Sequence, residues 1–410
     1  MNGRMIDVAA NDGSGSFQAY LTLPAAGKGP GLVLAQEIFG VNDTMRAQAD
    51  AFAEEGYVVL VPDLFWRQEP GVQLGYTPED WQRAFGYYKG FDEDKGVDDI
   101  QAAITAVRAL PQCVGQVGVV GYCLGGKLAY LAACRTDAAA CVGYYGVGIE
   151  NNLDEAKDIE GQLTLHIAEK DPFCPPEARE KILAALGGLP QVEAFVYPGV
   201  DHAFARVGGE HFDKPAAGMA NQRSIAALRR VLGPHYDLSA LWDKHCEYEF
   251  ATRNVADTMA TMVAEPYVNH IPTLTGGVGG KLLAHFYRHH FVDSNPPDTM
   301  LIPISRTVGA TQVVDEMLFC FTHTSEVPWM LPGVPPTGKR VEIPLVAIVK
   351  FRGDKLCHEH IYWDQASVLV QIGLLDPKGL PVAGVETAKK LLDETLPSNA
   401  LMGKAWQPPV

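Results

Sequence analysis

Residues 116–127 read QVGVVGYCLGGK: an apolar run, then Gly121-x-Cys123-x-Gly125, then the start of a different pattern. This order predicts a buried strand that turns sharply into a helix, with Cys123 at the bend. Glycine suits the positions two residues to either side, because a Cβ there would collide with neighbouring backbone. Free N–H groups at a helix N-terminus favour a thiolate and a developing oxyanion. We therefore expect Cys123 to be a nucleophile.

The alternative is that Cys123 is one more small apolar residue, since free cysteines are often buried. The chain has eight cysteines. Most of the others are expected to be apolar packing residues; these are Cys113, Cys134, Cys141, Cys246, Cys320 and Cys357. A lone Gly-x-Cys-x-Gly is a weak motif, so the case for Cys123 depends on finding its partners.

Two further segments supply an acid and then a histidine, the chain order used by α/β hydrolases. Asp171 follows the apolar strand-like run 163–168, and Pro172 ends that strand. His202 follows the alternating run 192–197. In an open parallel sheet the carboxyl ends of strands meet at one edge, where ligands bind. His202 would take the thiol proton and Asp171 would orient the imidazole; the alternatives are a turn-forming aspartate and a surface histidine.

Four segments resemble the signatures of the dienelactone hydrolase, or carboxymethylenebutenolidase, family. They are QEIFGVN at 36–42, GYCLGG at 121–126, GYYG at 143–146 and HAFAR at 202–206. The resemblance covers about the first 235 residues and implies an α/β hydrolase fold, a mostly parallel sheet flanked by helices. It implies a cysteine-dependent enzyme that opens an unsaturated lactone carrying a carboxylate through an acyl thioester. The expected partner is thus a small lactone or ester, and no cofactor is expected.

The resemblance also implies catalytic roles, for Cys123, Asp171, His202 and Glu37. Glu37 would help to create the thiolate when substrate binds, and the N–H groups of Ile38 and Leu124 would form an oxyanion hole. Glu37 follows the apolar run 32–35, where a carboxylate needs a partner such as Arg206. A purely structural salt bridge is the alternative for this glutamate.

Substrate recognition is assigned to Arg206, which would pair with Glu37 or with the substrate carboxylate. The family uses a second arginine, and the position aligned with it holds Trp81, with Arg83 two residues on. Helix positions two apart do not face the same way. Either Arg83 binds substrate through a shifted loop, or this chain has no second arginine for the substrate carboxylate. The alternative for Arg206 is a solvated loop residue.

Composition excludes several classes of function. The 410 residues carry a formal net charge of -16, which disfavours nucleic acid or an acidic membrane surface as partner. No run approaches the roughly 20 apolar residues needed to span a bilayer, and the start lacks a signal-peptide pattern. Cysteines without C-x-x-C pairs indicate reduced thiols. We expect a cytoplasmic protein with no membrane partner and no metal, since no metal-binding motif is present.

A second domain is expected over residues 236–410, because Gly233-Pro234 breaks a helix predicted over 222–232. Helices are predicted over 241–250 and 280–291. Strands follow over 300–308, 313–322, 344–351 and 356–363, and Asp364 would cap a last helix through residue 375. This order indicates an α+β domain. The region, including EHIYWDQ at 359–365, resembles the SnoaL-like family and implies its cone-shaped fold.

The strand over 356–363 would place His358, His360, Tyr362 and Asp364 on one face, with His323 on a neighbouring strand. Such a row could line a pocket, but a hydrogen-bonded sheet surface or a homodimer interface is the preferred interpretation. No catalytic residue is expected there. Two functions remain: a hydrolase of this lactone or of a different lactone or ester, or a ligand-binding or assembly protein whose hydrolase half is residual. The intact series Cys123, Asp171, His202 favours the first.

Overall fold

The chain forms two compact units, Met1–His235 and Tyr236–Val410, in a computed structural model that describes residues 3–407. Each unit has a separate apolar core. Core residues of the first lie between Val8 and Leu228, and those of the second between Leu238 and Ile372. Among the described helices, none is long and apolar enough to cross a membrane.

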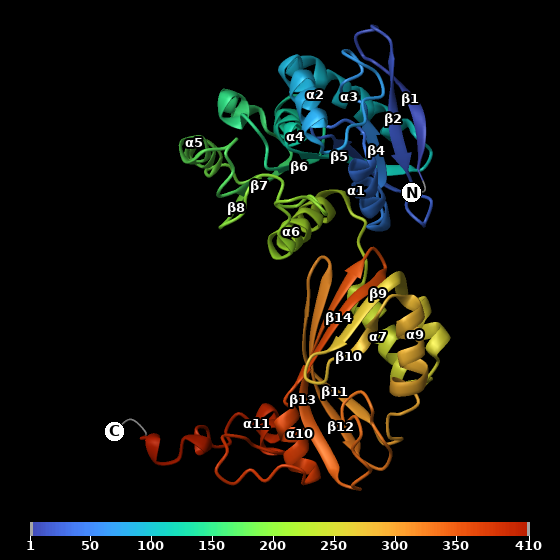
Figure 1. Ribbon diagram of the computed structural model, residues 1–410, viewed down its shortest axis with the longest axis vertical. Helices are drawn as coiled ribbons and strands as arrows, with labels where there is room; N and C mark the ends of the chain where they lie inside the picture. Colours follow the sequence, from blue (N-terminus) through green and yellow to red (C-terminus); the bar gives the residue numbers. More distant parts are fainter. Residues whose placement is uncertain (1–2, 408–410) are drawn as a thin grey trace. The chain divides into compact units, whose positions relative to one another are not determined.

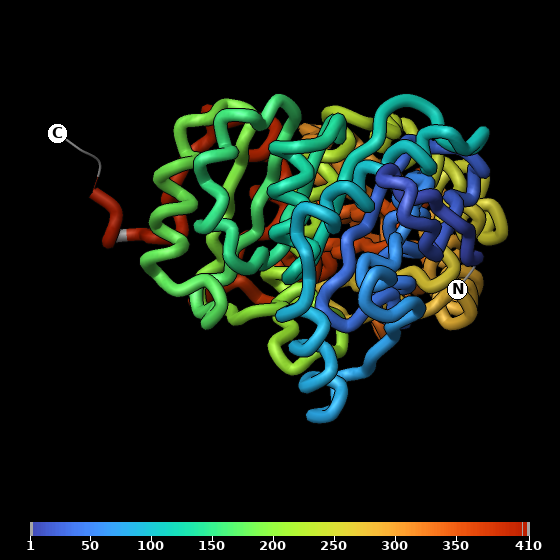
Figure 2. Tube along the Cα trace, turned by 90° about the horizontal axis from the view of Figure 1, so that it is seen from above, coloured from blue at the N-terminus to red at the C-terminus, as the bar shows by residue number. Residues whose placement is uncertain are grey.

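The first unit is built on an eight-stranded sheet (Figure 1). Its strands are β1 (Arg4–Ala9), β2 (Ser16–Thr22), β3 (Gly29–Ala35), β4 (Val58–Pro62), β5 (Cys113–Tyr122), β6 (Ala140–Tyr144), β7 (Gln162–Ala168) and β8 (Val192–Tyr197). They lie in the order β1-β2-β4-β3-β5-β6-β7-β8, with β2 antiparallel to both neighbours and β3 to β8 parallel. This is the expected α/β hydrolase fold, and Figure 2 shows the chain advancing across the unit from blue to green.

Helices cover both faces of this sheet. They are α1 (Asp43–Glu54), α2 (Pro78–Lys89), α3 (Glu93–Ala109), α4 (Leu124–Arg135), α5 (Pro176–Leu186) and α6 (Lys214–Leu232), with short 3₁₀ turns η1 (Ile149–Asn151) and η2 (Leu153–Asp158). Figure 1 shows α3 and α4 above the sheet and α1 and α6 below it. The last helix starts earlier than the predicted 222, because Asp213 caps it by accepting from the Ala216 N–H and Pro215 fits its first turn.

The second unit contains a six-stranded sheet. Its strands are β9 (Met262–His270), β10 (Thr275–Val278), β11 (Met300–Val308), β12 (Gln312–Thr322), β13 (Arg340–Arg352) and β14 (Lys355–Trp363). The order is β10-β9-β14-β13-β12-β11, and every neighbouring pair is antiparallel except β14 and β9. The predicted hairpin is present as β13 and β14, both longer than expected. Strands β9 and β10 were missed, since one proline and two glycines interrupt their apolar pattern.

The helices of the second unit include the three that were predicted and two that were not. They are α7 (Leu238–Cys246), α8 (Val255–Ala260), α9 (Gly280–Phe286), α10 (Gln365–Ile372) and α11 (Glu386–Leu392), with π-helical turns η3 (Glu247–Ala251) and η4 (Tyr287–Phe291) and a 3₁₀ turn η5 (Ala400–Ala405). The two that were not predicted are α8 and α11, and α10 ends at Ile372 instead of residue 375. The helices predicted over 241–250 and 280–291 each end in a π-helical turn. Such turns are rare and are frequently found at functional sites.

The polar row predicted on β14 faces away from the apolar core. Leu356, Glu359, Ile361 and Trp363 are the buried residues of this strand, while His358 and His360 are half-buried and lie 2.9 Å apart at their Nε2 atoms. Two other members of the expected set lie elsewhere. Asp364 caps α10 through the Ala366 N–H, and His323 is fully buried with its Nδ1 3.2 Å from Thr337 Oγ1.

We predict that residues 1–235, expressed alone, fold to the structure they have in the full chain, because their core contains no residue beyond Leu228. Near-ultraviolet circular dichroism and gel filtration should show a compact, natively packed fragment. The full-length chain, studied in parallel, should unfold in two transitions. An insoluble fragment without near-ultraviolet signal would show instead that the two units share a core.

Candidate active site

Cys123 lies at the sharp turn between β5 and α4 in a strained backbone conformation, with φ 58° and ψ -115°. The flanking glycines are required for this turn. A Cβ on Gly121 would lie 1.8 Å from the Gly125 carbonyl oxygen, and one on Gly125 would lie 2.3 Å from the Ala35 oxygen. The strand, turn and helix predicted from residues 116–127 are thus confirmed, together with the reason for both glycines.

Asp171 and His202 lie beside this cysteine, each in the loop after a parallel strand. His202 Nδ1 is 2.7 Å from Asp171 Oδ2, and Asp171 Oδ1 accepts a hydrogen bond from the Phe173 N–H at 2.8 Å. Both side chains are buried. The carboxylate fixes the proton on Nδ1, so the other ring nitrogen is available to the Cys123 sulfur, with which His202 hydrogen-bonds.

The electrostatics of His202 favour an imidazolium. Burial alone would lower the pKa of His202, but the charge of Cys123 and the hydrogen bonds with Asp171 and Cys123 raise it from an ordinary 6.5 to about 10. A thiolate beside an imidazolium is the reactive form of a cysteine nucleophile. His202 is therefore placed to exchange a proton with the Cys123 sulfur.

Glu37 and Arg206 form a second charged pair, and Arg206 lines the same pocket as Cys123. Arg206 Nε is 3.0 Å from Glu37 Oε2, and Arg206 Nη2 is 3.0 Å from Glu37 Oε1. The exposed fractions are 3% for Glu37 and 9% for Arg206, so the two charges neutralise one another away from water. Nη1 makes no hydrogen bond with any residue that the structure describes, and the guanidinium packs over the Tyr76 ring at 4.8 Å. That nitrogen can bind an anionic ligand.

The two backbone groups expected to hold an oxyanion are close to Cys123. Leu124 is the first residue of α4, so its N–H has no acceptor within the helix. Ile38 follows Glu37 in the loop after β3, and its side chain lines the same pocket as Cys123. The helix N-terminus adds a favourable dipole at this point.

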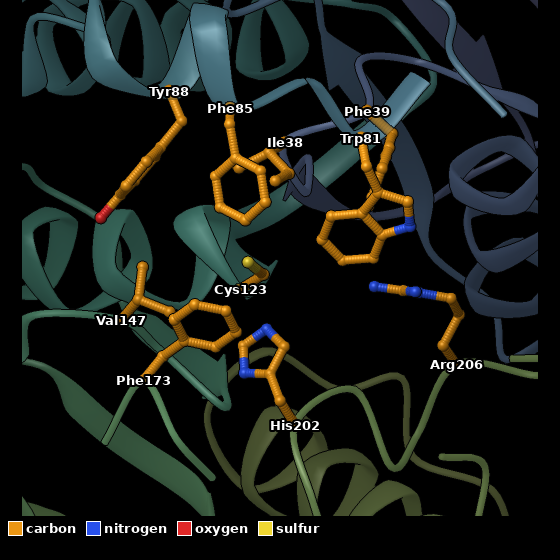
Figure 3. A pocket seen from close by; sticks show the side chains of 10 residues that line it. All are labelled: Ile38, Phe39, Trp81, Phe85, Tyr88, Cys123, Val147, Phe173, His202 and Arg206. Atoms are coloured by element: carbon orange, nitrogen blue, oxygen red, sulfur yellow. The ribbon is translucent and has the colours of Figure 1, made fainter. Parts of the chain in front are cut away.

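A narrow pocket leads to the sulfur (Figure 3). It has a volume of about 30 Å³, and a neighbouring hollow of about 330 Å³ shares four of its lining residues: Trp81, Phe173, His202 and Arg206. The wall is mostly apolar, with Phe39, Phe85, Tyr88 and Val147 completing it alongside Ile38 and Cys123. The hollow is more polar, since Asp201, Glu210 and His211 lie around it. An acyl group can enter the narrow part while a polar group remains in the hollow.

The position expected of Arg83 needs correction. Its side chain is 56% exposed and lies 3.9 Å from Glu69 Oε1, and it does not line the pocket. Trp81 lines the pocket in its place, because helix positions two apart point in different directions. Arg206 is accordingly the only arginine among the residues that line this pocket.

Sequence reasoning missed the aromatic residues of the wall. Trp81, Phe85 and Tyr88 lie on α2 at spacings of four and three residues, which places them on one helix face. This pattern can be read from the sequence, but it usually indicates packing. Phe173, the other aromatic residue missed, follows Asp171-Pro172, and its ring centroid is 4.9 Å from that of His202.

Comparison with known proteins supports this description of the first unit. The model of the dienelactone hydrolase family matches residues 17–232. A relative from Azospirillum brasilense is 50% identical over 234 residues, which cover 56% of this chain and 99% of the relative. A carboxymethylenebutenolidase from a Pseudomonas species is 40% identical over 220 residues, 53% of this chain and 92% of the relative. The matched residues 17–232 lie entirely within the first unit.

We predict that the ring of His202 titrates near pH 10 in the intact protein and at a clearly lower pH in the Cys123→Ala variant. The substitution removes the charge and the hydrogen bond that raise the pKa, and leaves the burial that lowers it. Because the folded pKa is above 6.5, this proton stabilises the fold fully below pH 6.5, and that contribution is lost as the pH rises to about 10. NMR titration of labelled histidine, assigned with a His202→Gln variant, measures both values. Identical titration in the two proteins would contradict an ion pair with Cys123.

Proposed function

Because the chain belongs to the dienelactone hydrolase family, whose members hydrolyse esters or lactones, we propose that it opens a carboxylate-bearing lactone through a thioester on Cys123. One observation carries the proposal: His202 contacts both of the other residues. Its Nδ1 lies 2.7 Å from Asp171 Oδ2, and the ring also hydrogen-bonds with the sulfur of Cys123. The name of the Pseudomonas relative supports an unsaturated, carboxymethylene-substituted lactone as substrate.

In the first step the Cys123 thiolate attacks the lactone carbonyl carbon, and a C–S bond forms. The N–H groups of Ile38 and Leu124 stabilise the negative charge that develops on the carbonyl oxygen. Collapse of this intermediate breaks the ring C–O bond, and His202 gives its proton to the leaving oxygen. Both halves of the opened substrate stay on the enzyme as one acyl chain, since the broken bond was part of a ring.

In the second step a water molecule attacks the thioester. Neutral His202 takes a proton from this water as the C–O bond forms, and Asp171 supports the imidazolium. The C–S bond then breaks and returns the thiolate, and the product leaves as a carboxylic acid that loses its proton to solvent. The polar hollow beside His202 supplies a route for the water.

Substrate recognition is assigned to the free Nη1 of Arg206. A substrate carboxylate bound there weakens the ion pair between Arg206 and Glu37. Glu37 can then accept the proton of the Cys123 thiol, and this proton returns to the sulfur after the thiolate is released in the second step. The transfer to Glu37 makes formation of the nucleophile depend on the presence of a carboxylate. It fits the burial of both charges next to the pocket.

The alternative is a related lactone or ester with less negative charge. Trp81 lies where the family has its second arginine, and the wall around Cys123 is aromatic. Such a wall favours an apolar or aromatic acyl group with one carboxylate over a dianion. This alternative changes the substrate and leaves the chemistry at Cys123 unchanged.

For the second unit we propose a SnoaL-like fold and a role in self-association. Support comes from the mixed sheet order, with β9 and β14 parallel, and from the helices α7 to α9 before the long strands. The edge strand β11 exposes Met300, Ile302 and Val308, which suit a contact with a second copy. The alternative function is an assembly protein whose hydrolase half has lost its activity. The complete arrangement of Cys123, His202 and Asp171 disfavours this alternative.

We predict that Cys123→Ala lowers kcat/KM for lactones and activated esters by at least about 10⁴-fold, because no acyl thioester can form. Cys113→Ala is the matched control, since Cys113 begins β5, the strand that leads to Cys123, and lies outside the pocket. Acid quenching of the wild-type enzyme during turnover should trap the acyl group on the peptide containing Cys123. Full activity of the variant, or an adduct on another residue, would exclude the mechanism.

A second variant addresses recognition. Arg206→Gln combined with Glu37→Gln removes the charged pair without leaving a buried carboxylate unpaired. We expect the preference for a carboxylate-bearing substrate over its methyl ester to fall by about 10- to 100-fold, the size of one charge-assisted hydrogen bond. Arg83→Gln should leave this preference unchanged, because Arg83 is exposed and outside the pocket. If Arg83→Gln also lowered the preference for the carboxylate-bearing substrate, Arg83 would have to bind the substrate.

A further inference from the structure

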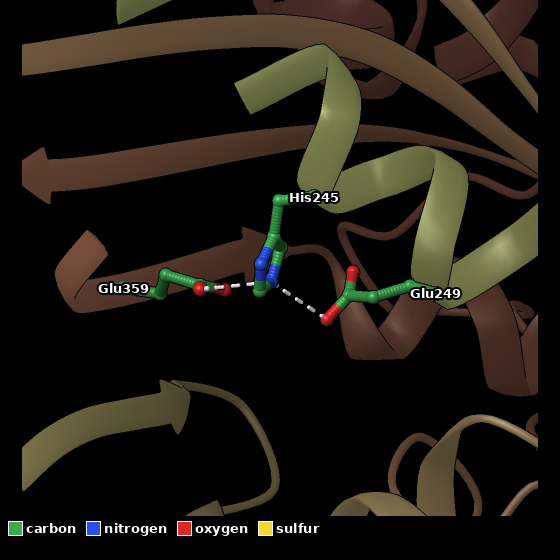
Figure 4. A group of neighbouring side chains, drawn as sticks. All are labelled: His245, Glu249 and Glu359. Atoms are coloured by element: carbon green, nitrogen blue, oxygen red, sulfur yellow. Dashed lines mark hydrogen bonds and ion pairs between the residues drawn. The ribbon is translucent and has the colours of Figure 1, made fainter. Parts of the chain in front are cut away.

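The second unit contains a buried cluster that the hydrolase chemistry does not use: His245, Glu249 and Glu359 (Figure 4). His245 Nε2 lies 3.1 Å from Glu249 Oε1 and 3.3 Å from Glu359 Oε1, and the three ligand atoms all lie within 4.8 Å of one another. The exposed fractions are 0%, 3% and 3%. In the described part of the chain, this is the only group of three possible metal ligands.

Three different elements position these side chains. His245 is near the end of α7, Glu249 lies in the π-helical turn η3, and Glu359 comes from the buried face of β14. Figure 4 shows the imidazole between the two carboxylates. Four-residue spacing on one helix brings His245 and Glu249 together, which is the spacing that metal ligands on a helix require.

The hydrogen bonds of His245 fix its tautomer. The Thr261 hydroxyl donates to the Thr258 carbonyl at 2.6 Å, so it has no second proton for the imidazole. It therefore accepts from the His245 Nδ1–H, also at 2.6 Å. The lone pair or proton on Nε2 is thereby directed at the two glutamates. A hydrogen bond of this kind at the remote nitrogen is what orients a metal-binding histidine.

The two carboxylates are poorly compensated by protein groups. Among the described residues, their only ion pairs are with His245. Burial raises the pKa of Glu359 to about 8, because its charge has so little compensation. Glu359 Oε1 accepts no hydrogen bond although it is fully buried. Buried carboxylates normally pair completely or coordinate a metal. A divalent ion with a neutral imidazole would balance both charges.

The cluster lies at the polar end of an apolar cavity. Glu249 and Glu359 line this cavity of about 30 Å³ together with aromatic residues that include Trp242, Tyr287 and Phe291. Three protein ligands that leave a fourth position facing a cavity are typical of catalytic rather than structural metal sites. The cavity has room for a water molecule at that fourth position.

We propose that His245 Nε2, Glu249 Oε1 and Glu359 Oε1 bind one divalent first-row transition-metal ion, with an open coordination position toward the apolar cavity. Metal–ligand bonds of 2.0–2.2 Å at tetrahedral angles separate ligand atoms by roughly 3.3–3.6 Å. The two contacts of His245 Nε2, 3.1 and 3.3 Å, are close to this separation, and the two glutamate oxygens lie within 4.8 Å of each other. The mixed nitrogen and oxygen donors suit Zn²⁺ or Mn²⁺ and not Mg²⁺.

The test is Zn²⁺ and Mn²⁺ binding to the full-length protein after treatment with a chelator, followed by isothermal titration calorimetry. One tight Zn²⁺ site per chain is expected, with no comparable site for Mg²⁺. Anomalous diffraction from crystals grown with Zn²⁺ should place a peak between the three side chains. No Zn²⁺ site tighter than about 0.1 mM, or no anomalous peak at the cluster, would overturn the proposal and leave a buried ion triad without metal.

Variants separate this site from surface binding. Glu249→Gln and Glu359→Gln should each weaken the tight site by more than about 100-fold, since losing a ligand exceeds the effect of losing a remote partner. The control is His285→Ala with His289→Ala, an exposed pair at the same four-residue spacing with ring centroids 4.6 Å apart. Loss of the tight site in this control, with retention in both glutamine variants, would show an adventitious surface site only. Circular dichroism confirms that each isosteric variant is folded.

Discussion

The close approach of backbone at Gly121 and Gly125 is the constraint on which the rest of the first unit depends. It forces Cys123 to φ 58°, and thereby lifts the sulfur out of the sheet and sets it at the start of α4. The same turn leaves the Leu124 N–H without a helical acceptor. Because the sheet is parallel here, the loops after β3, β7 and β8 end at the same edge. Glu37, Asp171 and His202 lie in these loops, and His202 reaches the sulfur.

Charge at this edge is arranged in two adjacent buried pairs. One is the Cys123 and His202 pair supported by Asp171, and the other is Glu37 with Arg206. Each pair is satisfied by its own partner. Under the proposed mechanism, a ligand carboxylate would disturb the second pair through Arg206 and leave the contact between His202 and Asp171 in place.

The sequence was sufficient where a residue's role follows from local backbone chemistry. The elbow glycines, the strand ended by Pro172 and the position of His202 are of this kind. Reasoning failed where a role depends on tertiary contacts. Arg83 lies on an exposed helix face, and the sequence could not say which side of α2 meets the pocket. On β14 the sequence pattern raised His358 and His360 as residues that could line a pocket. The polar residue of this strand that lines the apolar cavity of the second unit is Glu359, which lies between them on the opposite face and belongs to the proposed metal site.

The burial of the other cysteines has a consequence for redox chemistry. Burial raises the pKa of six thiols and keeps them protonated at neutral pH; these are Cys113, Cys134, Cys141, Cys174, Cys246 and Cys320. Peroxide attacks thiolates, so these six resist conversion to sulfenic acid. Cys123 sits beside an imidazolium and is open to a pocket. Oxidants would therefore damage the reactive sulfur while sparing most of the protein's thiols, and inactivation would precede any loss of structure.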